Sequence, residues 1–167
     1  MSRLGVLFAL TNKEVEDLKA VPEKKRYDYM SNKFEKRLFG TERACALDKA
    51  WYGIQLCLGR GKWRETWSSP FNIVVGGEYL VDNENELITL KNRDQLKDII
   101  YYLTHFDLAE VLAKRYPEML DRILKEDIKL PPYVTDLPYL QENCRDLRPF
   151  YENAVKEHMQ VIFTVDL

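Results

Sequence analysis

The sequence predicts an α+β fold: one domain, residues 1–167, in which several helices pack on a small mixed or antiparallel sheet. Two short apolar runs, residues 5–10 and 161–165, have the composition of buried strands. Between them most apolar residues recur at helical spacing, without the regular alternation of strands and helices that builds a parallel sheet. A chain of 167 residues is long enough for one sizeable core.

Residues 47–58 are the predicted central helix of this domain. Its apolar residues recur at helical spacing: Leu47, Trp51, Ile54 and Leu58. Asp48 is placed as the N-cap, because its carboxylate could accept from the free amides of the first turn. Gly59 follows the last turn, where a glycine ends a helix without penalty. A helix with a tryptophan on its apolar side needs cover from more than one direction, so we expect it to be central.

Before this helix, the first strand is followed by two predicted helices. Thr11 and Glu14 have the spacing of a capping box at the start of the first. Pro22 suits the first turn of the second, where its missing amide costs nothing. That helix runs to Phe39 with many cations on its outer side, and Gly40 ends it.

After the central helix, the sequence predicts two more strands. Residues 71–75 are mainly apolar and are halted by Gly76 and Gly77, and residues 87–90 are weakly strand-like. Residues 80–85 are polar and are expected to be exposed. A tight turn is the simplest role for the two glycines, which match no nucleotide-binding fingerprint.

The C-terminal half is predicted to be mainly helical. Capping residues or proline mark three helix starts: Thr89 or Asn92, Asp107, and Pro117. Residues 140–159 form one or two helices with a break or kink at Pro149. Leu124 and His158 are among the side chains expected to point inward. The proline-rich connection 129–138 is no domain boundary, because the segment after it is too short to form a core of its own.

Composition predicts a soluble cytoplasmic protein. The formal net charge of −2 argues against a chain built to hold a polyanion, so nucleic acid is an unlikely partner. Three cysteines leave one thiol unpaired, which favours a reducing compartment. The apolar start is too short for a signal peptide, and no run approaches the roughly 20 residues of a membrane span.

The segment Leu-Asp-Lys-Ala-Trp-Tyr-Gly-Ile-Gln-Leu-Cys-Leu-Gly at residues 47–59 resembles the Asp-Lys-x-Trp signature of the YfbM-like family, a bacterial domain of unknown function. The first strand, the Gly-Gly-Glu turn at residues 76–78, the later helices and the closing strand are similar to family segments in the same order. The resemblance implies the family's fold and a bacterial source, but no activity. Tyr52 and Gln55 stand where family members often have histidines, so no role of those histidines carries over.

No catalytic residue, metal site or cofactor is predicted. His105 and His158 lie far apart and lack metal-ligand spacing to a cysteine or carboxylate. Cys45 is the best-placed nucleophile, because a helix N-terminus lowers the pKa of a thiol. With no histidine nearby to act as a base, a buried structural cysteine is the favoured interpretation.

The loop after the central helix is the best candidate for a binding surface. It combines aromatic and cationic residues of the kind enriched at interface hot spots: Arg60, Trp63, Arg64 and Trp67. The simpler alternative is that the tryptophans cover the central helix while the cations stay solvated. A third alternative, stacking on nucleic-acid bases, is disfavoured by the net charge.

The predicted function is therefore non-catalytic binding of a protein partner, for example by an immunity or inhibitor protein that covers a toxin's active site. The alternative is an enzyme or small-ligand-binding protein. Its cleft would lie near the N-terminus of the 47–58 helix and would be lined by Asp48, Trp51, Tyr52 and Glu78.

Overall fold

The structure is a computed structural model that describes residues 4–62, 64 and 68–166. Its centre is a five-stranded sheet in the order β2-β1-β5-β4-β3, with every neighbouring pair antiparallel. The strands are β1 (Gly5–Leu10), β2 (Ala44–Asp48), β3 (Glu78–Asp82), β4 (Glu86–Lys91) and β5 (Gln160–Asp166). The predicted α+β class is confirmed, and the sheet is the antiparallel alternative.

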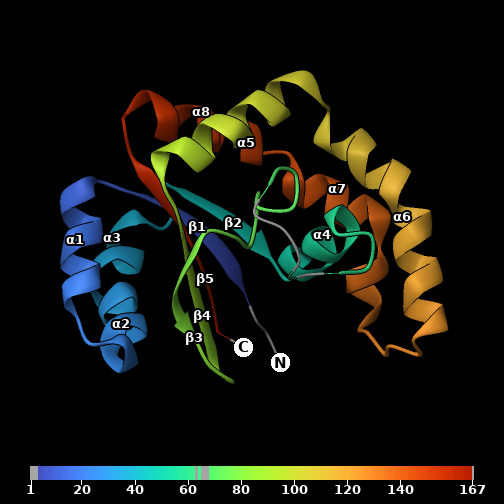
Figure 1. The fold of residues 1–167 in the computed structure, drawn as a ribbon, viewed down its shortest axis with the longest axis horizontal. Helices are drawn as coiled ribbons and strands as arrows, with labels where there is room; N and C mark the ends of the chain where they lie inside the picture. Colours follow the sequence, from blue (N-terminus) through green and yellow to red (C-terminus); the bar gives the residue numbers. More distant parts are fainter. Residues whose placement is uncertain (1–3, 63, 65–67, 167) are drawn as a thin grey trace.

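Helices cover both faces of the sheet (Figure 1). On one face lie α1 (Asn12–Ala20), α2 (Glu23–Met30), the π-helix η1 (Ser31–Glu35) and α3 (Lys36–Leu38). The other face carries α4 (Ala50–Leu58), α5 (Arg93–His105), α6 (Leu108–Lys125), the 3-10 helix η2 (Pro132–Thr135), α7 (Leu137–Cys144) and α8 (Leu147–Lys156). The molecule therefore has three layers and two cores.

The strands supply both cores by alternation of their side chains. In β1, Leu7 and Ala9 belong to the larger core beneath α4–α8, whereas Val6, Phe8 and Leu10 belong to the smaller core beneath α1–α3. Successive side chains of a strand point to opposite faces, so a strand covered on both faces is apolar throughout. This explains why residues 5–10 form a continuous apolar run in an antiparallel sheet.

Helix α4 is central, as predicted, although its start differs. Each of its residues except Tyr52 is buried. Trp51 packs so closely on β1 that a Cβ added to Gly5 would lie 2.5 Å from the Trp51 Cγ. Asp48 is not the N-cap: it ends β2 with a left-handed φ of 50°, and Lys49 precedes the first helical residue. Residues 44–48 pair with β1, and this pairing outweighs their helical spacing.

Two predictions for the chain between α4 and β4 were wrong. Residues 72–75 are buried and Phe71 is half-buried, but the chain there bends and joins no strand of the described sheet. The stretch 80–85 was expected to be exposed, yet it begins within β3, where Leu80 and Val81 are buried. An irregularity in the register between Tyr79 and Val81 brings both adjacent apolar residues inward, and this breaks the alternation on which strand prediction depends.

The capping predictions were better than the proline predictions. Thr11 and Glu14 form the predicted capping box, and Asn92 caps α5. Pro117, expected to start a helix, lies inside the continuous α6, whose buried stripe continues on both sides of it. Pro149 lies in the first turn of α8, where its missing amide is harmless, and the break falls just before that helix. Leu124 and His158 are exposed rather than inward.

Candidate functional site

The structure does not bring the predicted cleft residues together. Asp48 ends the edge strand β2, and Glu78 begins the opposite edge strand β3. Four strand spacings of about 4.8 Å separate these edge strands, so their backbones lie about 19 Å apart and the two residues cannot line one cleft. Glu78 instead pairs with Lys19 of α1, at 2.6 Å between Nζ and Oε2. Trp51 is buried in the larger core, which leaves Asp48 and Tyr52 near the surface.

Asp48 is held by a neighbour that sequence reasoning did not name. The Tyr139 hydroxyl on α7 donates to Asp48 Oδ2 at 2.9 Å. Desolvation and this hydrogen bond to a carboxylate raise the pKa of Tyr139 to about 12. Beside them the Lys49 ammonium lies 5.7 Å from the centre of the Tyr133 ring. This arrangement fixes the N-terminal end of α4 against α7 and η2.

The cations of the predicted binding loop are tied to neighbouring elements. Arg60 Nε lies 3.3 Å from a carboxylate oxygen of Glu118 on α6. Arg64 makes a bidentate pair with Asp82 on β3, with N–O distances of 2.9 and 3.0 Å, and its guanidinium lies over Tyr79. Trp63 and Trp67 lie outside the described residues. Their role in binding stays a prediction.

The three cysteines are structural thiols. Cys45 lies in β2 rather than at a helix start, so the expected activation of its thiol is absent from its surroundings. Burial raises the pKa of Cys45, Cys57 and Cys144 to about 12. The Cys57 and Cys144 thiols donate to the carbonyls of Leu112 and Gln141, at 3.2 and 3.1 Å. Such neutral thiols are weak nucleophiles.

The residues that the structure describes include neither a metal-binding cluster nor a membrane-spanning helix. Within them, histidine, cysteine and carboxylate side chains form no group of three or more that could hold a metal ion. In the same part of the chain every helix is too short or too polar to cross a lipid bilayer.

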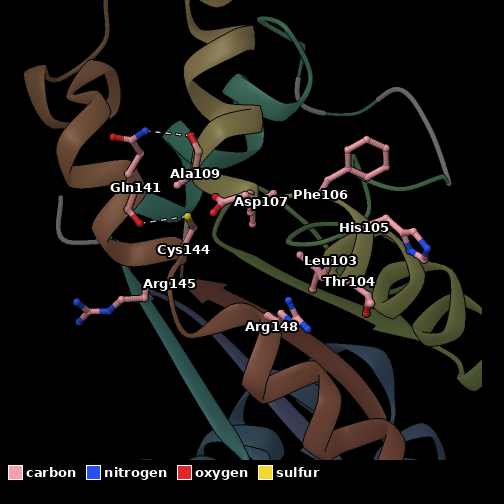
Figure 2. A pocket seen from close by; sticks show the side chains of 11 residues that line it. Leu103, Thr104, His105, Phe106, Asp107, Ala109, Gln141, Cys144, Arg145 and Arg148 are labelled. Carbon is pink, nitrogen blue, oxygen red and sulfur yellow. Dashed lines mark hydrogen bonds between the residues drawn. The ribbon is translucent and has the colours of Figure 1, made fainter.

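A cavity that the sequence analysis missed lies where α5 turns into α6, facing the turn between α7 and α8 (Figure 2). Its volume is about 400 Å³. Leu103, Leu108 and Cys144 contribute buried, mainly apolar wall, while Arg145 and Arg148 are exposed at the rim. A pocket of this size is within the usual range for ligand sites and for the side chain of a partner protein.

An aromatic patch adjoins this cavity and consists of the exposed residues Tyr101, His105 and Phe106 and the half-buried Tyr102. Tyr101 stacks on His105 with ring centres 4.1 Å apart, and Tyr102 stacks on Phe106 at 4.6 Å. Tyr101 is nevertheless 65% exposed and Phe106 50% exposed. The patch and the cavity together are called the corner site below. Large exposed apolar side chains that cluster are the informative exception to the usual burial of such groups.

The corner site is built on helices that hold its walls in place. Asp107 caps α6 by accepting from the Glu110 amide at 3.2 Å. Gln141 on α7 donates to the Ala109 carbonyl on α6 at 3.0 Å, a bond that Figure 2 shows across one wall. Arg148 pairs with Glu152 one turn along α8, at 2.7 Å. The Gln141–Ala109 bond joins α7 to α6 beside the cavity, whereas the other two contacts lie within α6 and within α8 and order the side chains there.

A signal for the corner site is present in the sequence. The helical spacing of Leu96, Ile99, Ile100 and Leu103 marks the buried side of α5, and in the structure Ile100 is half-buried and the other three are buried. Tyr101 and Phe106 do not fall on that side, so two large aromatic residues remain on a face that nothing in the pattern covers. The cavity could not be predicted, because its walls come from helices whose packing the sequence does not specify.

Comparisons with known proteins support the fold without supplying an activity. The model of a family described as "Domain of unknown function (DUF1877)" matches residues 1–164. Among solved structures, the chain is similar to one titled "The Crystal Structure of a Protein of Unknown Function YfbM from Escherichia coli". The TM-score is 0.65 and the identity 14%, over 97% of this chain and 99% of that one. At this identity the likeness shows the fold alone. No curated protein matches the chain.

Proposed function

We propose, from the premise that the chain belongs to the DUF1877 family of YfbM-like domains, whose function is unknown, that this protein is a non-catalytic module that binds another protein. The observation that carries the proposal is the aromatic patch. Its exposed rings lie beside a cavity whose rim carries Arg145 and Arg148. Tyrosine and arginine next to a pocket are typical of the residues that dominate binding energy at protein interfaces.

The patch offers a partner a favourable gain from burial. Tyr101 and Phe106 still expose at least half of their surface in the free chain. Covering them would contribute about 2 kcal/mol each, at about 25 cal/mol per Å² of apolar surface. The cavity beside them can accept one bulky side chain of the partner. A small number of such contacts supplies most of the affinity of a typical interface.

The rigidity of the corner site also supports protein binding. The stacked rings restrain one another, and His105 Nδ1 lies 2.7 Å from the Tyr101 carbonyl oxygen. Side chains that are already ordered lose little conformational entropy when a partner binds. A preformed surface of this kind suits a domain whose role is to bind rather than to react.

A narrower form of the proposal is an immunity or inhibitor protein that covers a toxin's active site in the bacterial cytoplasm. Such a role needs a small, rigid domain with a ready-made binding surface, which the corner site offers. The identity of the captured partner would test this version separately from the general proposal.

Site-specific photo-crosslinking tests the proposal directly. A benzoylphenylalanine in place of Phe106 would be activated in cells of the source organism, and crosslinked proteins would be identified by mass spectrometry. The matched control places the same group at Leu124, which is 79% exposed on α6 but outside the patch. We expect one abundant protein to crosslink at position 106 and not at position 124.

Two outcomes would contradict protein binding at this site. One is the same set of proteins crosslinked at both positions. The other is a small molecule that co-purifies with the unmodified protein, is lost when Phe106 is changed to alanine, and comes without a protein partner. The second outcome would favour the ligand-binding alternative, for which the cavity volume is also suitable.

A further inference from the structure

Buried polar side chains concentrate around one irregular segment, residues 70–77. Among the described residues the buried polar or charged side chains are Gln55, Asn72, Thr89, Lys91 and Thr164. Asn72 lies within the segment, and Gln55, Thr89 and Lys91 lie beside it on α4 and β4. Polar groups are rarely buried unless they satisfy other buried polar groups, so this concentration requires an explanation.

These side chains bond the backbone of the segment in place of a neighbouring strand. Gln55 donates to the Phe71 carbonyl at 3.0 Å and accepts from the Val75 amide at 3.1 Å. The Tyr151 hydroxyl on α8 donates to the Ile73 carbonyl. Lys91 Nζ donates to the Val74 carbonyl at 2.6 Å. The segment is therefore held by individual side chains, each of which can be changed separately.

Lys91 is the unusual member of this group. Side-chain alternation in β4 directs it, like Leu87, into the larger core, where it is 0% exposed. Among the described residues its ammonium group forms no ion pair, and the single hydrogen bond of its side chain runs to the Val74 carbonyl. An ammonium group has three donors and a full charge, so burial with a single carbonyl strongly disfavours the charged form.

The other ionisable groups of this core do not compensate a charge on Lys91. Among the described residues, the buried ones are the Tyr151 hydroxyl on α8 and the thiols of Cys45 on β2, Cys57 on α4 and Cys144 on α7, and burial raises the pKa of each. All are neutral near pH 7. Desolvation alone lowers the pKa of Lys91 from 10.5 to about 7.

We infer that segment 70–77 is a pH-responsive latch, which the neutral amine of Lys91 holds closed and which a proton on that amine loosens. Opening of the latch would place Lys91 in water, where the ammonium is well solvated. The chain leaves the segment through Gly77, whose φ of +93° only glycine adopts easily. Gly76 and Gly77 therefore provide a flexible end about which the segment can move.

The direction of the pH effect follows from proton binding. Between about pH 7 and pH 10.5 the open form holds a proton on Lys91 and the closed form does not, so lower pH favours opening. The opening constant should increase about fiftyfold between pH 9 and pH 7. Below about pH 7 both forms are protonated, and the constant should level off.

Hydrogen exchange of the Val75 amide measures this opening. After correction for the intrinsic exchange rate, its protection should fall about fiftyfold from pH 9 to pH 7. Protection in Lys91→Met should be the same at both pH values, because methionine has a similar length and cannot titrate. Amides of β1 provide the internal comparison and should be better protected than Val75 at every pH, since the latch opens without global unfolding.

Either of two results would overturn the latch. One is a Val75 protection that does not change with pH in the wild type. The other is a Val75 protection equal to that of β1, which would make the opening global. If Lys91→Met does not fold, a ¹³Cε titration of Lys91 in the folded wild type decides the question. A midpoint near 7 supports the latch, and a midpoint near 10 overturns it.

Discussion

Segment 70–77 and the corner site depart from the usual burial pattern in opposite ways. At segment 70–77, Gln55, Thr89 and Lys91 place polar groups inside the protein. At the corner site, Tyr101 and Phe106 place aromatic rings outside it. Both kinds of exception are informative, because ordinary packing does not produce them.

This difference indicates that segment 70–77 contributes to the stability of the fold, whereas the corner site is free to bind a partner. Around segment 70–77 the side chains of Gln55, Thr89 and Lys91 each satisfy a backbone group in the core, so changing them affects folding. At the corner site the exposed rings face solvent, so changing them should affect binding but hardly folding. Matched substitutions in the two regions can test this separation.

The largest effect is expected at the end of segment 70–77. In Gly77→Ala the new Cβ would lie 2.0 Å from the Leu90 carbonyl oxygen, at a φ of +93°. We expect a loss of about 3 kcal/mol or more in the free energy of unfolding, measured by urea denaturation. The control is Gly40→Ala, whose φ is +80° and whose added Cβ has nothing within 4 Å. It should lose only about 1 kcal/mol, and equal losses would show that backbone strain, and not the close approach to β4, decides the effect.

The next largest loss of stability is expected at Gln55, and Gln141 at the corner site provides the comparison. Gln55→Leu leaves the buried Phe71 carbonyl and Val75 amide without their partner, which should lower the free energy of unfolding by about 2–4 kcal/mol. Gln141→Leu removes one bond to Ala109 at the partly exposed wall of the corner site, and should cost less than about 1 kcal/mol. Similar losses in the two variants would contradict the division between the regions.

These two regions also show what the sequence could and could not predict. Local rules worked where neighbouring residues decide the structure: the capping box at Thr11, the cap at Asn92 and the apolar run of β1. Residues 71–75 were taken for a strand because four of the five are apolar and a short apolar run is typical of one. The side chains that hold them in another conformation come from residues 55, 89, 91 and 151, and no local pattern contains those partners.

Predictions about single functional residues failed for the same reason. Asp48 has the sequence context of an N-cap, but its place at the end of β2 depends on pairing with Gly5, more than forty residues away. Asp48 and Glu78 were assigned to one cleft, and only the strand order shows that they lie at opposite edges. Long-range pairing decides both cases, and a single sequence does not reveal it.

A smaller change in stability is expected from the titration of Lys91. The unfolded chain binds a proton at Lys91 up to pH 10.5 and the folded chain only up to about 7, so the free energy of unfolding should rise with pH between these values. From pH 7 to pH 8 we expect a gain of about 1 kcal/mol in the wild type and none in Lys91→Met. Denaturation at both pH values measures it. The buried thiols have the opposite effect on the free energy of unfolding. Because their pKa is raised in the folded chain, only the unfolded cysteines ionise as the pH rises, which lowers this free energy. The effect begins only near pH 9 and so does not affect the comparison between pH 7 and pH 8.

The smallest effect on stability is expected at the corner site, where it is the most informative. Phe106→Ala and Tyr101→Ala remove rings that are at least half exposed, and each should change the free energy of unfolding by less than about 0.5 kcal/mol. The same variants should weaken binding of the crosslinked partner at least tenfold, because a hot-spot side chain contributes about 2 kcal/mol or more to an interface and about 1.4 kcal/mol corresponds to tenfold. Leu124→Ala, at a still more exposed position on α6, should change neither quantity. If instead the ring deletions destabilise the protein as strongly as Gln55→Leu, the aromatic patch is part of the fold. The exposure of its rings would then no longer argue for a partner.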